Sequence, residues 1–157
     1  MSSMEQMDQT ILTMLSADGR MSFTDLGRAT GLSTSAAQQR VHRLEQRGVI
    51  SGYRAELNPA ALGRTLIAFI SIRALNGRQD DDIPAVLADL PQITSCFSIA
   101  GDASFLCMAE VGDTADLDQL LSRIRHQAGV STSTTVVLTT FFRDRQLGWS
   151  NHDEVTA

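Results

Sequence analysis

The stretch 33–43, STSAAQQRVHR, groups side chains that could read the edges of nucleic-acid bases. Its hydroxyl and amide groups are short or adaptable, and none of these side chains is negatively charged. Glutamine can pair with adenine N6 and N7, serine and threonine can bond to several bases, and arginine can hold phosphates. The residues predicted to contact DNA are Arg20, Ser33, Thr34, Ser35, Gln38, Gln39, Arg40, His42 and Arg43.

Helical periodicity predicts the elements that position these groups. Helices are expected over 8–16, 22–30 and 33–47. In the third, Ala37, Val41 and Leu44 recur at i, i+4 and i+7, the spacing of a buried face, so most of the polar side chains point away from it.

Capping and turn residues separate the three predicted helices. Ser22 followed by Asp25 resembles a capping box, and Gly31 can take the positive φ of a tight turn. Ser33 caps the third helix, and Gly48 occupies the position after its end that glycine favours. Three helices with a glycine turn before the last predict a helix-turn-helix, although an ordinary three-helix core with a polar face would give the same pattern.

Charge is distributed unevenly between the two halves. The net charge is −5, yet residues 1–60 hold six arginines against six acids, and residues 61–157 hold seven against twelve. A neutral helical half is weakly charged for a DNA-binding domain. Two copies acting together on half-sites would offset this weakness.

From residue 65 onward the pattern changes to short β-branched and aromatic runs that alternate with amphipathic segments. Strands are predicted over 65–74, 93–100, 105–111 and 133–142, and helices over 81–90 and 114–129. The order βαββαβ predicts a ferredoxin-like domain, and the whole chain is therefore α+β, with an N-terminal helix-turn-helix (winged-helix-like) domain. The expected boundaries are 1–50 for the helix-turn-helix domain, 51–64 for a linker with a short strand, 65–150 for the ferredoxin-like domain and 151–157 for a tail.

A glycine-bearing loop, AGDAS (100–104), joins two of the predicted strands. Its backbone N–H groups could hold the carboxylate of a small zwitterion while Asp102 holds the amine. The alternative is a plain hairpin turn, which the pattern taken alone favours because Gly-Asp is common.

Nothing in the sequence predicts catalysis. His42, His126 and His152 are scattered, no nucleophile lies beside a base with an orienting acid, and no cluster has metal-ligand spacing. We therefore expect no enzyme, metal or cofactor. The longest apolar run, 66–72, is too short for a membrane span, and the N-terminus lacks a secretory pattern, so a cytoplasmic protein with no membrane partner is expected.

The two cysteines, Cys96 and Cys107, fit no zinc or CxxC pattern. Burial as small apolar residues is the expectation for free cysteines. They could lie opposite each other on a hairpin, where an occasional disulfide is conceivable, but a reducing cytosol does not favour one.

Residues 7–63 resemble the DNA-binding half of the Lrp/AsnC (feast/famine) transcriptional regulators. The likeness includes the aspartate that opens the first helix, the DGR turn, GLS, the Arg-x-x-Arg-Leu-Glu pattern, GVI and a later LG. The segment after residue 63 resembles the βαββαβ ligand-sensing domain of that family, so the likeness extends from about Met7 to Phe142.

The resemblance implies a bacterial regulator that binds double-stranded DNA and responds to an amino acid or related small effector. It also implies homodimers that form through the C-terminal sheets and assemble into octamers. The effector residues it implies are Gly101, Asp102, Ala103, Ser104, Ser133 and Thr135. The family's loop has an aromatic residue and a second aspartate where this chain has Ala103 and Ser104.

Two other functions stay open at this point. One is an architectural DNA-binding protein of the same fold that ignores small molecules, which the altered loop makes plausible. The other is a ligand-binding or assembly protein whose helical domain no longer binds DNA.

Overall fold

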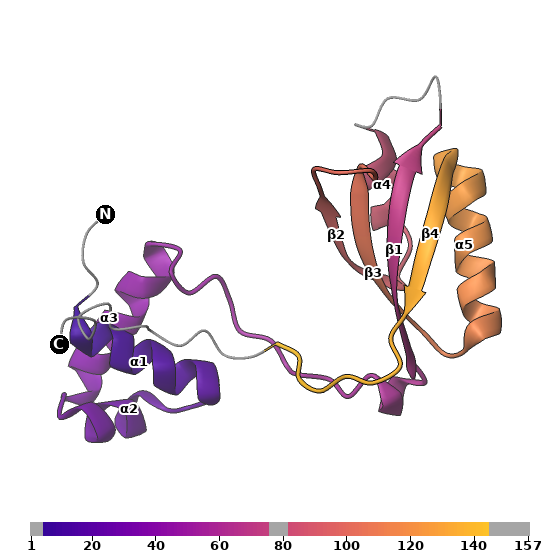
Figure 1. The fold of residues 1–157 in the computed structure, drawn as a ribbon. Helices are drawn as coiled ribbons and strands as arrows, with labels where there is room; N and C mark the ends of the chain where they lie inside the picture. Colours follow the sequence, from indigo (N-terminus) through magenta and orange to yellow (C-terminus); the bar gives the residue numbers. More distant parts are fainter. Residues whose placement is uncertain (1–4, 76–81, 145–157) are drawn as a thin grey trace, which may run out of the picture. The chain divides into compact units, whose positions relative to one another are not determined.

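The computed structural model describes residues 5–75 and 82–144. These residues form two compact units: one ends at Glu56 and also includes the described residues after Phe141, and the other is Leu57–Phe141 (Figure 1). The predicted tail, 151–157, and His152 lie outside the described residues, as does the start of the helix predicted over 81–90.

The first unit is a three-helix bundle, as predicted. Its helices are α1 (Gln6–Ala17), α2 (Phe23–Thr30) and α3 (Thr34–Gln46). The apolar positions at helical spacing meet in one core. That core consists of the fully or almost fully buried side chains of Ile11, Leu26, Ala37, Val41 and Leu44. Residues 5–56 contain helices and turns and no strand.

The caps predicted from the sequence are present. The Ser22 hydroxyl accepts a hydrogen bond from the Asp25 backbone N–H at 3.1 Å and donates to its carboxylate at 2.6 Å. Ser33 caps α3 by accepting from the N–H of Ala36 at 3.2 Å. Gly31 ends α2 with φ 72°, the left-handed conformation that costs glycine little.

The predicted linker, 51–64, has no strand. Instead a short 3-10 helix, η1 (Ala60–Leu62), follows Pro59 and ends at Gly63 with φ 73°. The strand prediction was wrong because the short apolar runs of this segment pair with no other strand. In addition, the Asn58 side chain accepts a hydrogen bond from the N–H of Ala60 at 3.0 Å, which favours a turn.

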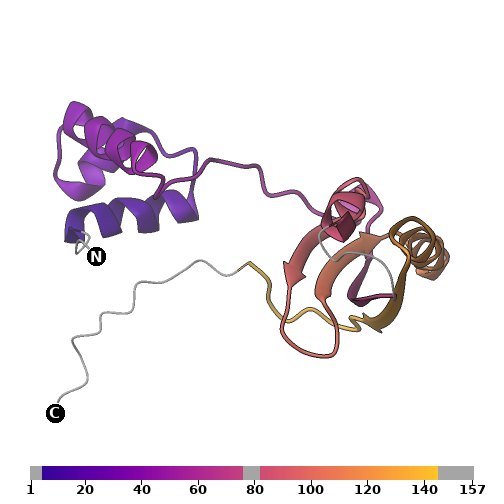
Figure 2. The same ribbon diagram turned by 90° about the horizontal axis from the view of Figure 1, so that it is seen from above.

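The second unit has the predicted βαββαβ order. Its elements are β1 (Leu66–Ala74), α4 (Ile83–Ala88), β2 (Ile93–Ser98), β3 (Phe105–Val111), α5 (Thr114–Ala128) and β4 (Val130–Val136). All strand pairs are antiparallel, in the order β2-β3-β1-β4. Both helices cover one face of the sheet (Figures 1 and 2), where they bury the alternate residues of the two central strands.

The two cysteines lie on the neighbouring strands β2 and β3. Burial is confirmed for Cys107, on a central strand, but the same prediction was wrong for Cys96, which is exposed. The difference follows from their strands, because Cys107 faces the helices from the middle of the sheet whereas Cys96 lies on the edge strand β2.

The last strand lies earlier in the chain than the predicted 133–142. Gly129 ends α5 with φ 60°, and β4 starts at the next residue by pairing Val130 with Ala74. The ladder runs out near Val136 because β1, its partner, begins at Leu66. Beyond this point Leu138 and Phe141 lie outside the strand, and they are 95% and 90% exposed.

Candidate nucleic-acid interface and ligand site

One face of α3 presents the polar side chains predicted to contact DNA. The residues of that set which are exposed are Ser33, Thr34, Ser35, Gln38, Gln39, His42, Arg43 and, before α2, Arg20. The opposite face of the helix is anchored in the core by Ala37, Val41 and Leu44. The exposed surface of α3 therefore presents uncharged hydrogen-bonding groups together with the Arg43 cation.

Arg40 is placed differently from the prediction. Its guanidinium donates to the carboxylates of Glu5 and Asp8, each at 2.7 Å. The Arg40 side chain is 22% exposed and that of Asp8 is 11% exposed. The two hydrogen bonds raise the pKa of Arg40, the one to Glu5 more than the one to Asp8. Arg40 thus ties α3 to the start of α1, and a phosphate would have to share its guanidinium with these two carboxylates.

Local partners further divide the polar face. The hydroxyl groups of Ser33 and Ser35 lie 3.1 Å apart. His42 contacts Gln46 at 3.0 Å and the Glu45 carboxylate at 3.5 Å. Several side chains of this face therefore already have a partner within the helix.

Thr34, Gln38, Gln39 and Arg43 differ from Ser33, Ser35 and His42 on this face. No side-chain hydrogen bond or ion pair engages any of these four within residues 5–75 and 82–144. They are therefore the groups of α3 that are best able to accept a partner from outside.

The segment after α3 is fastened to that helix. The Tyr53 hydroxyl donates to Glu45 at 3.0 Å. Burial raises the pKa of Tyr53, and its bond to Glu45 raises it further. This contact holds the first residues of the linker beside the C-terminal turns of α3.

The predicted effector loop borders a hollow on the face of the sheet away from the helices. The hollow has a volume of about 560 Å³. It is lined by Ser71, Arg73, Ile99, Asp102, Ala103, Ser131, Thr132 and Ser133. Three of the six predicted effector residues, Asp102, Ala103 and Ser133, therefore lie around one space.

The other three predicted residues lie outside this hollow. Gly101 and Ser104 line a neighbouring hollow of about 540 Å³, on the side of the loop that includes Phe105. Thr135 lies two residues beyond Ser133 on the same face of β4, opposite Phe69 of β1.

Arg73 is the charged residue of this site that the sequence analysis did not predict. It lies near the end of β1, and its Nε donates to the backbone carbonyl of Asp102 at 2.7 Å. A cation in the run LIAFISIRA, in which Ser71 is the only other polar residue, was the signal available in the sequence. Only the folded structure shows that β1 and the loop meet. The backbone N–H of Ser104 makes a second contact between them by donating to the carbonyl of Ile72 at 2.9 Å.

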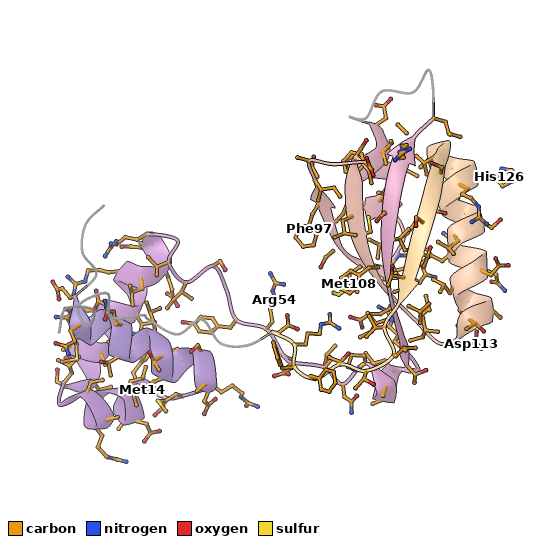
Figure 3. The ribbon with its side chains drawn as sticks, viewed as in Figure 1. Met14, Arg54, Phe97, Met108, Asp113 and His126 are labelled. Carbon is orange, nitrogen blue, oxygen red and sulfur yellow. The ribbon has the colours of Figure 1, made fainter. Side chains whose placement is uncertain are left out.

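The same face of the sheet continues as an apolar surface. Strand pairing places Phe69 opposite Met108 and Phe97 opposite Leu106, and Phe97 is 56% exposed. In Figure 3, Phe97 and Met108 lie on the sheet, whereas His126 extends outward from α5. We call the side chains of Ile67, Phe69, Phe97, Leu106 and Met108 the open sheet face.

Two other kinds of site find no support in the described part of the chain. No group of three or more histidine, cysteine, aspartate or glutamate side chains could hold a metal ion there. None of the described helices has the length and apolar character needed to cross a bilayer.

Comparison with known proteins matches both units to one family. An AsnC-type helix-turn-helix domain matches residues 4–45, and an Lrp/AsnC ligand binding domain matches residues 67–147. The HTH-type transcriptional regulator LrpA of Mycobacterium tuberculosis is 43% identical over 92% of this chain and 96% of its own length. The leucine-responsive regulatory protein of Escherichia coli K12 is 33% identical over 86% of this chain and 84% of its own length.

Solved structures agree in fold and in sequence. The feast or famine regulatory protein of M. tuberculosis, complexed with L-methionine, superposes with a TM-score of 0.85 at 43% identity, covering 91% of this chain and 97% of that one. Because the matches include both units in order and nearly the whole length, this chain belongs to the Lrp/AsnC family of transcriptional regulators.

Proposed function

We propose that this chain binds operator DNA through α3 and that an amino acid bound beside the loop 99–104 modulates its assembly or DNA affinity. The observation that carries the effector half is the hollow in which the Arg73 guanidinium lies against the loop that bears Asp102. On this proposal the protein is a regulator without catalytic activity, and it acts in the cytoplasm.

The chemistry of the hollow suits a zwitterion. The bond from Arg73 to the loop uses Nε, one of five N–H donors of a guanidinium. The remaining donors can pair with an α-carboxylate in the bidentate manner that arginine favours. The Asp102 carboxylate can accept from an α-ammonium, and the hydroxyl groups of Ser71 and Ser133 can supply the remaining bonds. A 43% identical relative in complex with L-methionine supports an amino acid as the ligand class.

Ala103 sets which effector side chain the hollow can select. The methyl of Ala103 leaves the space that an aromatic residue would fill. We therefore propose that the effector's side chain occupies that space. Its α-amino and α-carboxylate groups would be held as described above.

The DNA half of the proposal rests on the open groups of α3. A recognition helix places its N-terminal residues against base edges in the major groove. We propose that Gln39 reads a base, with Thr34, Ser35, Gln38 and His42 nearby, and that Arg43 and Arg20 hold phosphates.

Assembly is the third part of the proposal. The open sheet face is apolar and lies on the side of the sheet without helices, so a second copy can cover it in a homodimer. Dimers would assemble further into octamers. Several helix-turn-helix units on one particle raise the effective concentration at the operator, which offsets the neutral charge of each.

A thermal-shift screen of the twenty amino acids tests the effector half. At least one amino acid should raise the melting temperature, because a ligand that binds only the folded state stabilises it. Arg73→Gln should abolish that shift, whereas Arg123→Gln, which lies on α5, should keep it. A shift that survives in Arg73→Gln would contradict the proposed site.

A gel-shift across the protein's own upstream region tests the DNA half. A salt-sensitive complex is expected, and its absence at every protein concentration would refute DNA binding. Tight DNA binding with no response to any amino acid would instead favour the architectural alternative. The observation behind that alternative is that Ala103 and Ser104 depart from the family's effector loop.

A further inference from the structure

The two cysteines of the chain face each other across neighbouring strands. Cys96 of β2 is the register partner of Cys107 of β3, and both are free thiols. Residues directly opposite in an antiparallel pair have Cα atoms about 4.5 to 5.5 Å apart. Disulfides span Cα distances of about 4.4 to 6.8 Å. A bond between these two residues therefore requires no change of register.

We propose that Cys96 and Cys107 form an oxidisable dithiol that hydrogen peroxide converts to an intrachain disulfide joining β2 to β3. The inference concerns the thiols themselves and does not depend on the proposed effector or operator.

The two thiols differ in environment in a way that assigns their order of reaction. Cys96 is exposed, whereas Cys107 is 0% exposed in the core. Burial, and to a smaller extent a hydrogen bond with Cys96, raises the pKa of Cys107 to about 12. Since the thiolate is the nucleophile and must reach the oxidant, Cys96 reacts first.

The reaction balances with peroxide as the only oxidant. The Cys96 sulfur attacks one peroxide oxygen, the O–O bond breaks, and a sulfenic acid and one water form. The Cys107 sulfur then attacks the sulfenic sulfur. Its proton leaves with the displaced hydroxyl as a second water, and the S–S bond is complete.

The resulting bond is expected to be readily reduced. Opposed Cβ atoms in a sheet lie about 4.5 to 5.5 Å apart, whereas a relaxed disulfide prefers about 3.5 to 4.5 Å. Strained or exposed disulfides have more oxidising potentials and are the labile ones. The pair therefore stays reduced in an ordinary reducing cytosol and closes only under oxidant exposure.

The cross-link would act on one edge of the sheet. β2 is an edge strand in the order β2-β3-β1-β4, and its pairing with β3 is irregular between Ile93 and Ser95. The hairpin loop from Ile99 to Ser104 begins three residues after Cys96 and ends three residues before Cys107. A disulfide would fix both arms of that loop, and any effect on effector affinity rests on the proposed function.

Peroxide treatment of the full-length reduced protein, followed by maleimide labelling and peptide mass mapping, tests the proposal. Wild type should lose both free thiols and yield one intrachain Cys96–Cys107 peptide pair that glutathione reduces. Cys107→Ser should stop at a sulfenic acid on Cys96 that dimedone traps, whereas Cys96→Ser should leave Cys107 reduced. Thiols that stay free after peroxide, or disulfides found only between chains, would overturn the proposal.

Hydrogen exchange of the ligand-free protein supplies a second readout. Amides of β2 and of residues 99–104 should exchange more slowly in the oxidised than in the reduced wild type, and Cys96→Ser should show no such difference. Equal exchange in both forms would refute the stapling of the edge strand. Because no effector or DNA is present, this result is independent of whether the proposed function is correct.

Discussion

Arg40 shows how far a residue's role depends on its three-dimensional neighbours. It lies one position from Gln39, yet its guanidinium is bonded to Glu5 and Asp8 and is not directed outward. Because an unpaired, nearly buried carboxylate is costly, this contact fixes the position of α3 against α1. Gln39 and Arg43 on the same helix are free to recognise a partner.

Arg40→Ala should lower the free energy of unfolding by about 1 to 3 kcal/mol, because it removes two charge-assisted bonds and leaves Asp8 unpaired. The matched control is Arg43→Ala on the exposed face, expected to change stability by no more than about 0.5 kcal/mol. Urea denaturation measures both. Equal losses in the two variants would show that the Arg40 contacts do not hold α3.

Gln39→Ala and Arg43→Ala should affect DNA binding differently. Loss of Gln39 should cost about 1 to 3 kcal/mol at one base pair if its contact is bidentate, and so change sequence preference. Loss of Arg43 should weaken binding to every sequence and reduce the slope of log affinity against log salt by about 0.9. Binding titrations on an operator and its single-base variants separate the two, and identical effects on all sequences would contradict the assigned roles.

The raised pKa of Cys107 predicts a loss of stability at alkaline pH. The unfolded thiol ionises near its ordinary pKa of 9.0, whereas the folded thiol stays protonated up to about 12. The contribution of the protonated Cys107 thiol to the free energy of unfolding is therefore complete below pH 9 and is lost as the pH rises from 9 towards 12. Stability falls in this direction because the unfolded thiol releases its proton at a lower pH than the folded thiol. Between about pH 8.5 and 10.5 under reducing conditions, the melting temperature of wild type should fall more steeply than that of Cys107→Ala. Parallel curves would exclude this cause.

At the scale of the element, the turn between α2 and α3 depends on a close backbone approach. A Cβ added at Gly27 would lie 2.7 Å from the carbonyl oxygen of Leu32. The Gly27 carbonyl also accepts the N–H bonds of Gly31 and Leu32. The helix therefore passes so near the turn that only glycine fits without displacement.

Gly27→Ala should destabilise the protein by about 1 to 3 kcal/mol, as overpacking against a fixed backbone does. Gly19→Ala is the control, because its added Cβ meets only ordinary contacts, with Tyr53 Cδ1 at 3.6 Å. Circular dichroism melts of both variants measure the difference. A neutral Gly27→Ala would mean that the turn opens easily.

At the scale of the whole molecule, the sheet divides the second unit into two unlike faces. The helices cover one face with a continuous apolar core, and the open sheet face leaves aromatic side chains such as Phe97 exposed. Exposed apolar patches of this kind mark protein interfaces, which is why assembly belongs to the proposed function.

Phe97→Asp should lower the particle mass measured by light scattering after gel filtration, because it buries a charge in the proposed dimer interface. His126→Asp is the matched control: His126 is exposed on the outer side of α5 (Figure 3), and the particle mass should not change. An unchanged mass for Phe97→Asp would refute assembly through this face.

The sequence by itself determined the order of elements, the caps and the core of this protein. Those features follow from local rules: apolar spacing of about 3.6 or 2 residues, hydroxyls before helices and glycines after them. Ser33, Gly31 and the triad Ala37, Val41 and Leu44 could therefore be predicted correctly without coordinates.

Only the tertiary structure decided which groups meet across the chain. The pairing of Arg40 with Asp8, the contact of Arg73 with the Asp102 carbonyl and the opposition of Cys96 and Cys107 join residues that are 11 to 32 positions apart. Strand pairing and helix packing set these contacts. Periodicity shows which face of an element is buried, but it does not show which other element covers that face or pairs with it. The end of β4 was likewise fixed by where its partner strand begins and not by its own apolar run.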